Sequence, residues 1–187
     1  FVASAWSGGS KGRFLNGLSF TWERGVVVGI GGGAGSGKST WGRAMVRLLQ
    51  PTSGRVLFDG TDITHLSEAG LRPLRRRFQM IFQDPMSSLN PRHRVGQIIA
   101  APLRLHGVAG AKTRVAEALD HVGLSVTMAE RYPHELSGGQ RQRVGIAGGT
   151  ALRPELLLAE EIGSGPAVSN PRTGAQRGGR LGSVWGG

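Results

Sequence analysis

The most constraining feature of the sequence is a glycine-rich segment between an apolar run and a helix-like pattern. Residues 32–39 read GGAGSGKS, which fits the pattern G-x-x-x-x-G-K-[ST]. The apolar run 26–30 precedes it and predicts a buried strand, while residues 39–50 carry apolar side chains at helical spacing. In such a loop, backbone N–H groups and the positive end of the following helix dipole face the same concave site. The segment therefore predicts a phosphate-binding loop in an α/β protein.

Each polar residue of this loop has an expected role in binding a nucleotide. Lys38 would reach the β- and γ-phosphates, Ser39 would ligate Mg²⁺, and Thr40 would lie beside the α-phosphate. The backbone donors come from the glycine-rich part, which comprises Gly32, Gly33, Gly35, Ser36 and Gly37. The alternative is a glycine-rich turn without a ligand in a chain that has 32 glycines among 187 residues.

Charge and composition limit the remaining classes of function. Lysine and arginine number 23 against 12 acidic residues, a formal net charge of +11 that suits a polyanionic partner. The densest cluster, Arg72 with Arg75–Arg77, is short and has no interleaved aromatic residues, so we expect no nucleic-acid partner. The chain has no cysteine, which excludes disulfides, thiolate metal sites and cysteine nucleophiles. The five histidines lack metal-ligand spacing, and no apolar run approaches the roughly 20 residues of a membrane span.

The pattern along the chain predicts a series of short elements. We expect a loop over residues 1–12, a hairpin with strands 18–22 and 26–30, and a helix over 39–50 that Pro51 ends. Further strands are expected at 55–58, 78–82 and 156–159, and helices at 95–105, at 113–122 and from about Gln140. The glycine-rich tail 162–187 has no sustained period and is expected to be poorly ordered.

A second motif, LSGGQ at residues 136–140, lies at the start of the last expected helix. A serine and two glycines at a helix N-terminus can form another phosphate receptor, from free N–H groups and one hydroxyl. The alternative is an N-capped helix without a ligand. The strand at 156–159 follows and ends in Glu160 and Glu161.

Together these motifs resemble the ATP-binding cassette (ABC) ATPases, in which LSGGQ is the signature. Residues 80–92 (MIFQDPMSSLNPR) and 132–137 (YPHELS) are similar to the oligopeptide and dipeptide importer branch. The resemblance covers roughly residues 14–161 and leaves 1–13 poorly matched. It implies a P-loop α/β fold with a mainly parallel core sheet, an antiparallel β-subdomain and a helical subdomain at about 84–150, incomplete at the C-terminus.

The resemblance also implies cofactors, partners and site residues. The cofactors would be ATP and Mg²⁺, with Ser39, Gln83 and Glu160 near the metal and Glu161 as general base. Gln83 would also sense the γ-phosphate, and the segment after it would dock on transmembrane subunits at the cytoplasmic face of the plasma membrane. A second ATPase subunit would hold the nucleotide over which this chain's signature closes, through Ser137, Gly138, Gly139 and Gln140.

Several positions depart from the family pattern. The family ends its acidic strand with Asp-Glu-Pro, where this chain has Glu160, Glu161 and Ile162. Ala167 replaces the dimer-loop aspartate, and no residue matches the switch histidine. We therefore expect nucleotide binding with feeble or no hydrolysis. Two alternatives are a nucleotide-binding module without useful turnover and a DNA-associated ATPase of the same superfamily. The short interval between Gly32 and Leu136 leaves no room for the latter's long coiled coil.

Overall fold

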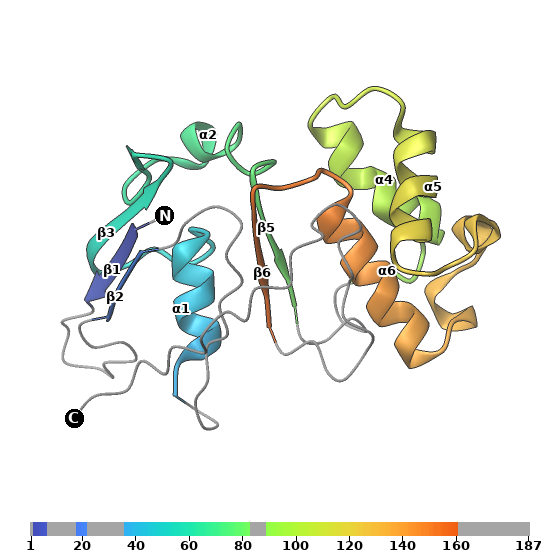
Figure 1. Ribbon diagram of the computed structural model, residues 1–187, viewed down its shortest axis with the longest axis horizontal. Coiled ribbons are helices and arrows are strands. Elements are labelled where there is room, and N and C mark those ends of the chain that lie inside the picture. Colours follow the sequence, from blue (N-terminus) through green and yellow to red (C-terminus); the bar gives the residue numbers. More distant parts are fainter. Residues whose placement is uncertain (1, 7–17, 22–35, 83–88, 161–187) are drawn as a thin grey trace, which may run out of the picture. The chain divides into compact units, whose positions relative to one another are not determined.

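The computed structural model describes residues 2–6, 18–21, 36–82 and 89–160 (Figure 1). The described residues fall into two compact units, one within residues 2–67 and the other within residues 68–160. Each unit is described separately.

The first unit contains an antiparallel sheet with the strand order β2-β1-β3-β4. Its strands are β1 (Val2–Trp6), β2 (Leu18–Thr21), β3 (Ser53–Phe58) and β4 (Thr61–Asp62). The prediction of a loop over 1–12 is therefore wrong for residues 2–6. This segment pairs on one side with β2 and on the other with β3, and such backbone pairing needs no strong side-chain pattern. The expected partner strand of the hairpin, 26–30, lies outside the described residues.

Helix α1 (Lys38–Met45) ends five residues earlier than predicted. Arg47 adopts the left-handed conformation with a φ of 54°, which interrupts the helix before Pro51. Its buried guanidinium donates from Nε to the carbonyl of Ile63 at 2.9 Å and from Nη2 to that of Leu66 at 3.2 Å. A tertiary anchor, rather than the proline, therefore sets the end of the helix.

A hydrogen-bonded corner follows the turn between β3 and β4. The turn residues Asp59 and Gly60 have φ values of 50° and 77°, which is the geometry of a tight hairpin turn. Asp62 Oδ1 accepts from both the backbone N–H and the hydroxyl of Thr64. The buried hydroxyl of Thr64 in turn accepts from the N–H of Val56 at 2.8 Å, so this network joins β3 to the chain after β4.

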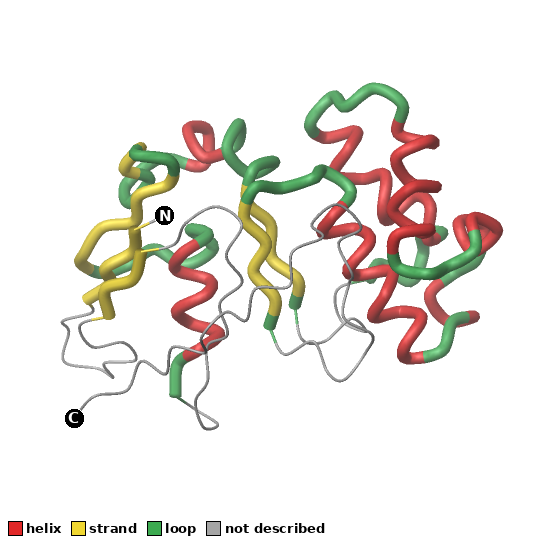
Figure 2. Tube along the Cα trace, viewed as in Figure 1, coloured by secondary structure: helices red, strands yellow, loops and turns green. Residues whose placement is uncertain are grey.

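The second unit combines a parallel strand pair with a group of helices (Figures 1 and 2). Strands β5 (Phe78–Ile81) and β6 (Leu156–Ala159) pair in parallel, with Phe78 opposite Leu156 and Ile81 opposite Ala159. The helices are α2 (Glu68–Leu71), α4 (Val95–Leu105), α5 (Ala111–His121) and α6 (Gly138–Thr150), with 3₁₀ turns η1 (Val126–Glu130) and η2 (Pro133–Glu135). The predicted bounds of α4 and β6 are confirmed, whereas α2, β4 and the two 3₁₀ turns were not predicted.

The core of the second unit lies among α4, α5 and α6. Val95, Ile99 and Leu103 recur every four residues along α4 and are fully buried, so one face of the helix points into this core. Leu89 and Leu136 also belong to it, although they precede α4 and α6 in sequence. Both α4 and α5 thus contribute apolar side chains to this core, with Val115 as one of those from α5.

Candidate nucleotide site

The N-terminus of α1 suits an anion. Gly37 precedes the helix with a φ of 85°, a left-handed conformation that favours glycine, and no side chain of the described residues caps the helix there. The first turn contains no acidic residue. A helix N-terminus without a side-chain cap or a competing carboxylate offers its amide groups and its dipole to a negatively charged ligand.

The structure gathers the described part of the predicted phosphate loop at this helix end. Lys38 Nζ lies 3.4 Å from Ser36 Oγ, and both belong to the loop-to-helix junction. Ser39 is exposed and Thr40 half-buried in the first turn of α1. Gly32, Gly33 and Gly35 lie outside the described residues.

The signature motif caps α6, which begins two residues earlier than predicted. Ser137 Oγ accepts from the N–H of Gln140 at 3.3 Å, and Gln140 Oε1 accepts from the N–H of Ser137 at 2.9 Å. A Cβ built on Gly138 or on Gly139 would meet no atom within 4 Å, and neither glycine has a positive φ. Two consecutive glycines in the first turn cost helix stability, and no packing within the described chain requires them.

The acidic strand end lies beside the end of β5. The N–H of Glu160 donates to the carbonyl of Ile81 at 2.9 Å, so the chain leaves both parallel strands at the same edge. Gln83 and Glu161, the expected metal sensor and general base, follow these strands and lie outside the described residues.

The oxygen donors of Ser39 and Glu160 are of the kind that Mg²⁺ prefers. Mg²⁺ usually takes only one or two protein carboxylates together with waters and phosphate oxygens, so a dense cluster of acids is not required. Within residues that the structure describes, no group of three or more His, Asp or Glu side chains could hold a metal ion. The donor chemistry of the predicted set therefore fits Mg²⁺ bound together with a nucleotide.

The sequence analysis did not predict a cluster of stacked side chains that precedes the signature. The guanidinium of Arg94 lies 5.5 Å from the ring centroid of Tyr132, whose ring stacks on that of His134 at 5.6 Å. Tyr132 and the carboxylate of Glu130 raise the pKa of Arg94, because both favour the charged guanidinium. Tyr132 is close to the signature in sequence and could have been found, but Arg94 is brought there only by the fold.

The parallel strand pair and the glycine-containing starts of α1 and α6 are features of a P-loop nucleotide-binding α/β domain. The chain belongs to the ABC transporter family, whose model matches residues 15–163. This confirms the predicted fold class and the resemblance from which it was inferred. In the described part of the chain, no helix is both long and apolar enough to cross a bilayer.

Curated relatives and solved structures agree with this membership. The oligopeptide transport ATP-binding protein AppF of Bacillus subtilis is 49% identical over 161 residues, which cover 84% of this chain and 49% of AppF. The glutathione import ATP-binding protein GsiA of Salmonella paratyphi A is 48% identical over 81% of this chain and 25% of GsiA. The ATP-binding cassette MJ0796, solved as a dimer bound to ADP and Pi, has a TM-score of 0.74 at 30% identity over 84% of this chain and 70% of that one. The chain spans about half the length of AppF, the first of these relatives.

Proposed function

We propose that this chain is an ATP-binding subunit that couples ATP binding and hydrolysis to the import of oligopeptides or dipeptides. The observation that carries the proposal is the pair Gly138 and Gly139, which no contact in the described chain requires and which leave open space beside the capped N-terminus of α6. Similarity to AppF, named as an oligopeptide transport protein, supports the choice of cargo. The domain that performs this function spans residues 14–161.

In this proposal the phosphates of ATP bind the loop at residues 32–40. Lys38 neutralises the β- and γ-phosphates, and the amide groups of the first turn of α1 add the helix dipole. Mg²⁺, held by Ser39, Gln83 and Glu160 with the phosphates, would neutralise charge that develops on the transferred phosphoryl group. Glu161 would accept a proton from the attacking water.

The signature is proposed to act on a nucleotide held by a second ATPase subunit. Ser137, Gly138, Gly139 and Gln140 would face that nucleotide, with the Ser137 hydroxyl and the amide groups of α6 as donors. MJ0796, an ATP-binding cassette of similar fold, has been solved as a dimer, which supports this arrangement.

Transmembrane subunits are the proposed membrane partners, and the chain would lie at the cytoplasmic face of the plasma membrane as a peripheral subunit. The docking surface is proposed at residues 83–92. Leu89 is buried in the core of the second unit, so it supports this surface from within and does not contact a partner. Arg92 is exposed on the turn before α4 and is available for contact.

Co-purification from membranes tests the proposed function. The chain, co-expressed with the transmembrane subunits of an oligopeptide importer, should co-purify with them. Replacing Ser87, Ser88 and Arg92 together should abolish the complex, while Arg153→Ala, a charge loss on another exposed segment, should not. Salt-sensitive binding to anionic vesicles without any such complex would contradict the proposal.

A second candidate function is nucleotide binding without useful turnover. It is favoured by Glu160, which stands where the family has aspartate and whose extra methylene displaces the carboxylate in a site of strict octahedral geometry.

A further inference from the structure

The segment that precedes the signature is held against the N-terminus of α4. The N–H of Val95 donates to the carbonyl of Arg131 at 2.9 Å, so the first residue of α4 is bonded to that segment through the backbone. A Cβ built on Gly96 would lie 3.1 Å from the carbonyl oxygen of Ala129, so the two backbones approach closely at a glycine. The backbones of residues 95–96 and 129–131 are therefore closely packed and hydrogen-bonded at this junction.

Arg94 reinforces the same junction through its side chain and its backbone. Its Nη1 donates to Glu130 Oε2 at 2.5 Å, and its guanidinium lies over the Tyr132 ring. Its backbone N–H donates to Gln97 Oε1 at 2.9 Å, which fixes Arg94 at the start of α4. One residue thus joins the helix end, η1 and Tyr132.

From Tyr132 the connection continues to the signature through short steps. The N–H of Tyr132 donates to Glu135 Oε2 at 2.6 Å, and Arg141 Nη1 of α6 donates to the carbonyl of Pro133 at 3.2 Å. Leu136, the first residue of the signature, is buried in the core. Residues 130–133 are therefore hydrogen-bonded to the start of α4 at Glu130 and Arg131, and to α6 at Pro133.

We propose that Arg94 is a positioning residue for the signature: by holding residues 130–132 against α4, it sets the orientation of Ser137 at the N-terminus of α6. The inference rests on the proposed function, in which Ser137 contacts a nucleotide. The chain enters α4 directly after the proposed docking surface, so Arg94 also links that surface to the signature.

Amide hydrogen exchange on the full chain tests the link without any nucleotide. The amides of Glu135, Leu136, Gln140 and Arg141 are hydrogen-bonded and report on the signature. In Arg94→Ala they should exchange about three- to tenfold faster, since an exposed ion pair and a cation–π contact are lost. Arg94→Lys should restore part of the protection, because it keeps the charge but loses the planar stack.

Arg153→Ala is the matched control. It removes an exposed Arg–Glu pair of the same unit, in which Arg153 Nη2 lies 3.0 Å from Glu117 Oε2. The signature amides should keep their parent exchange rates in this variant. Unchanged signature exchange in Arg94→Ala, or an equal increase throughout α4, α5 and α6, would overturn the proposal.

A functional readout completes the test. Arg94→Ala should need several-fold more ATP for half-maximal dimerisation by light scattering, while its calorimetric affinity for ATP as a monomer stays that of the parent. Local loss of protection with normal dimerisation would overturn the positioning role. A parent chain that binds no ATP would instead overturn the proposed function, and the exchange experiment would still decide whether Arg94 orders the signature.

Discussion

Gly149 of α6 lies so close to Ile81 of β5 that a Cβ built on the glycine would be 2.9 Å from Ile81 Cγ1. Real Cβ atoms essentially never approach another carbon so closely, so the helix packs on the strand at a distance that only glycine permits. A Cβ built on Gly145 or Gly148 would meet nothing within 4 Å. Of the three glycines that weaken the interior of α6, one therefore has a packing role.

We predict opposite effects of alanine at these positions. Gly145→Ala and Gly148→Ala should each stabilise the fold by about 0.8–1 kcal/mol, the difference in helix propensity. Gly149→Ala should destabilise it by about 1–3 kcal/mol, because the new methyl overpacks against Ile81. Urea denaturation measures all three free energies of unfolding.

A double-mutant cycle checks the cause. In the Ile81→Ala background the clash is absent, so Gly149→Ala should cost less there than in the parent. Strictly additive losses would contradict the packing explanation.

The hydrogen bonds from Thr64 to Asp62 predict that the stability of the fold decreases in acid. Hydrogen bonds from the hydroxyl and the N–H of Thr64 hold the pKa of Asp62 below its ordinary value of 3.8. A depressed folded-state pKa gives stability that is present above the unfolded pKa and is lost as the pH falls through the folded one. Between pH 5 and pH 2, Asp62→Asn should therefore lose less stability than the parent.

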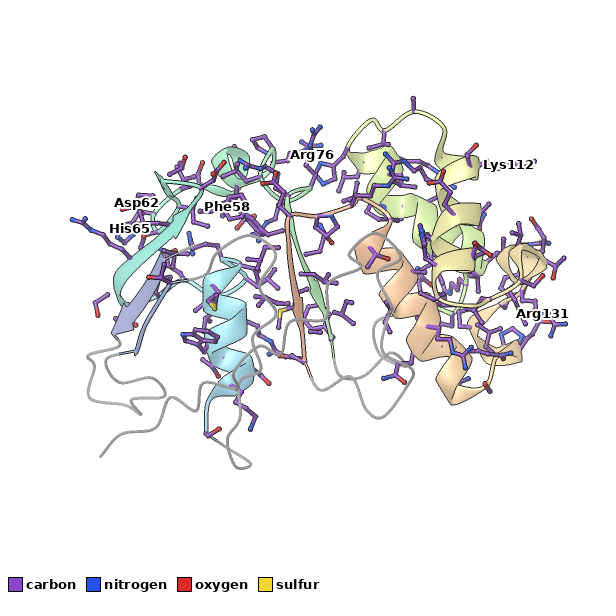
Figure 3. All side chains as sticks on the ribbon, viewed as in Figure 1. Phe58, Asp62, His65, Arg76, Lys112 and Arg131 are labelled. Atoms are coloured by element: carbon purple, nitrogen blue, oxygen red, sulfur yellow. The ribbon has the colours of Figure 1, made fainter. Side chains whose placement is uncertain are left out.

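Thermal unfolding as a function of pH measures the loss of stability in acid for the parent and for Asp62→Asn. Figure 3 labels Asp62 and His65. Asp120→Asn, a change on the exposed surface of α5, controls for the loss of one carboxylate. Identical acid slopes in the parent and in Asp62→Asn would show that the Thr64 network does not act on the folded state.

The signature glycines should separate stability from function. Gly139→Ala is expected to stabilise α6, because there is open space around the glycine and alanine favours the helix. The same methyl should weaken ATP-driven dimerisation, since it occupies the surface proposed to face the partner's nucleotide. Light scattering with non-hydrolysable ATP measures dimerisation, with Gly148→Ala as the control for helix propensity. Normal dimerisation by Gly139→Ala would argue against the signature assignment.

Elements defined by local pattern could be predicted from the sequence. The apolar run 156–159 and the aliphatic face of α4 gave β6 and α4 with their observed bounds. Those that depend on tertiary contacts could not. β1 is a strand because it pairs with both β2 and β3, and α1 ends early because buried Arg47 binds the carbonyls of Ile63 and Leu66.

The same distinction applies to the candidate site. Both glycine-rich motifs carry a sequence pattern, so their places at the starts of α1 and α6 could be predicted. Arg94 has no motif of its own and acts through contacts with Tyr132 and Glu130 on a distant segment. Only the fold brings it to the signature.

We predict that turnover is weaker than binding. Phosphate release with saturating ATP should stay well below about one per second, the lower end of ordinary turnover numbers. Glu160 stands where the family has aspartate, and loss of one preorganised contact at such a site typically costs on the order of 10² to 10³ in rate. Glu161→Gln, which lacks the proposed general base, serves as the negative control for turnover. Turnover near one per second that this variant abolishes would contradict the prediction.

Calorimetric titration of Mg-ATP into the purified chain tests the central claim most directly. The parent should bind, Lys38→Ala should bind at least tenfold more weakly, and Lys112→Ala should match the parent, because Lys112 is an exposed residue of α5 in the other unit (Figure 3). Circular dichroism should show the same helix content in all three proteins. Equal affinity of folded Lys38→Ala and parent, or no binding by a folded parent, would contradict the assignment of residues 32–40 as the nucleotide site.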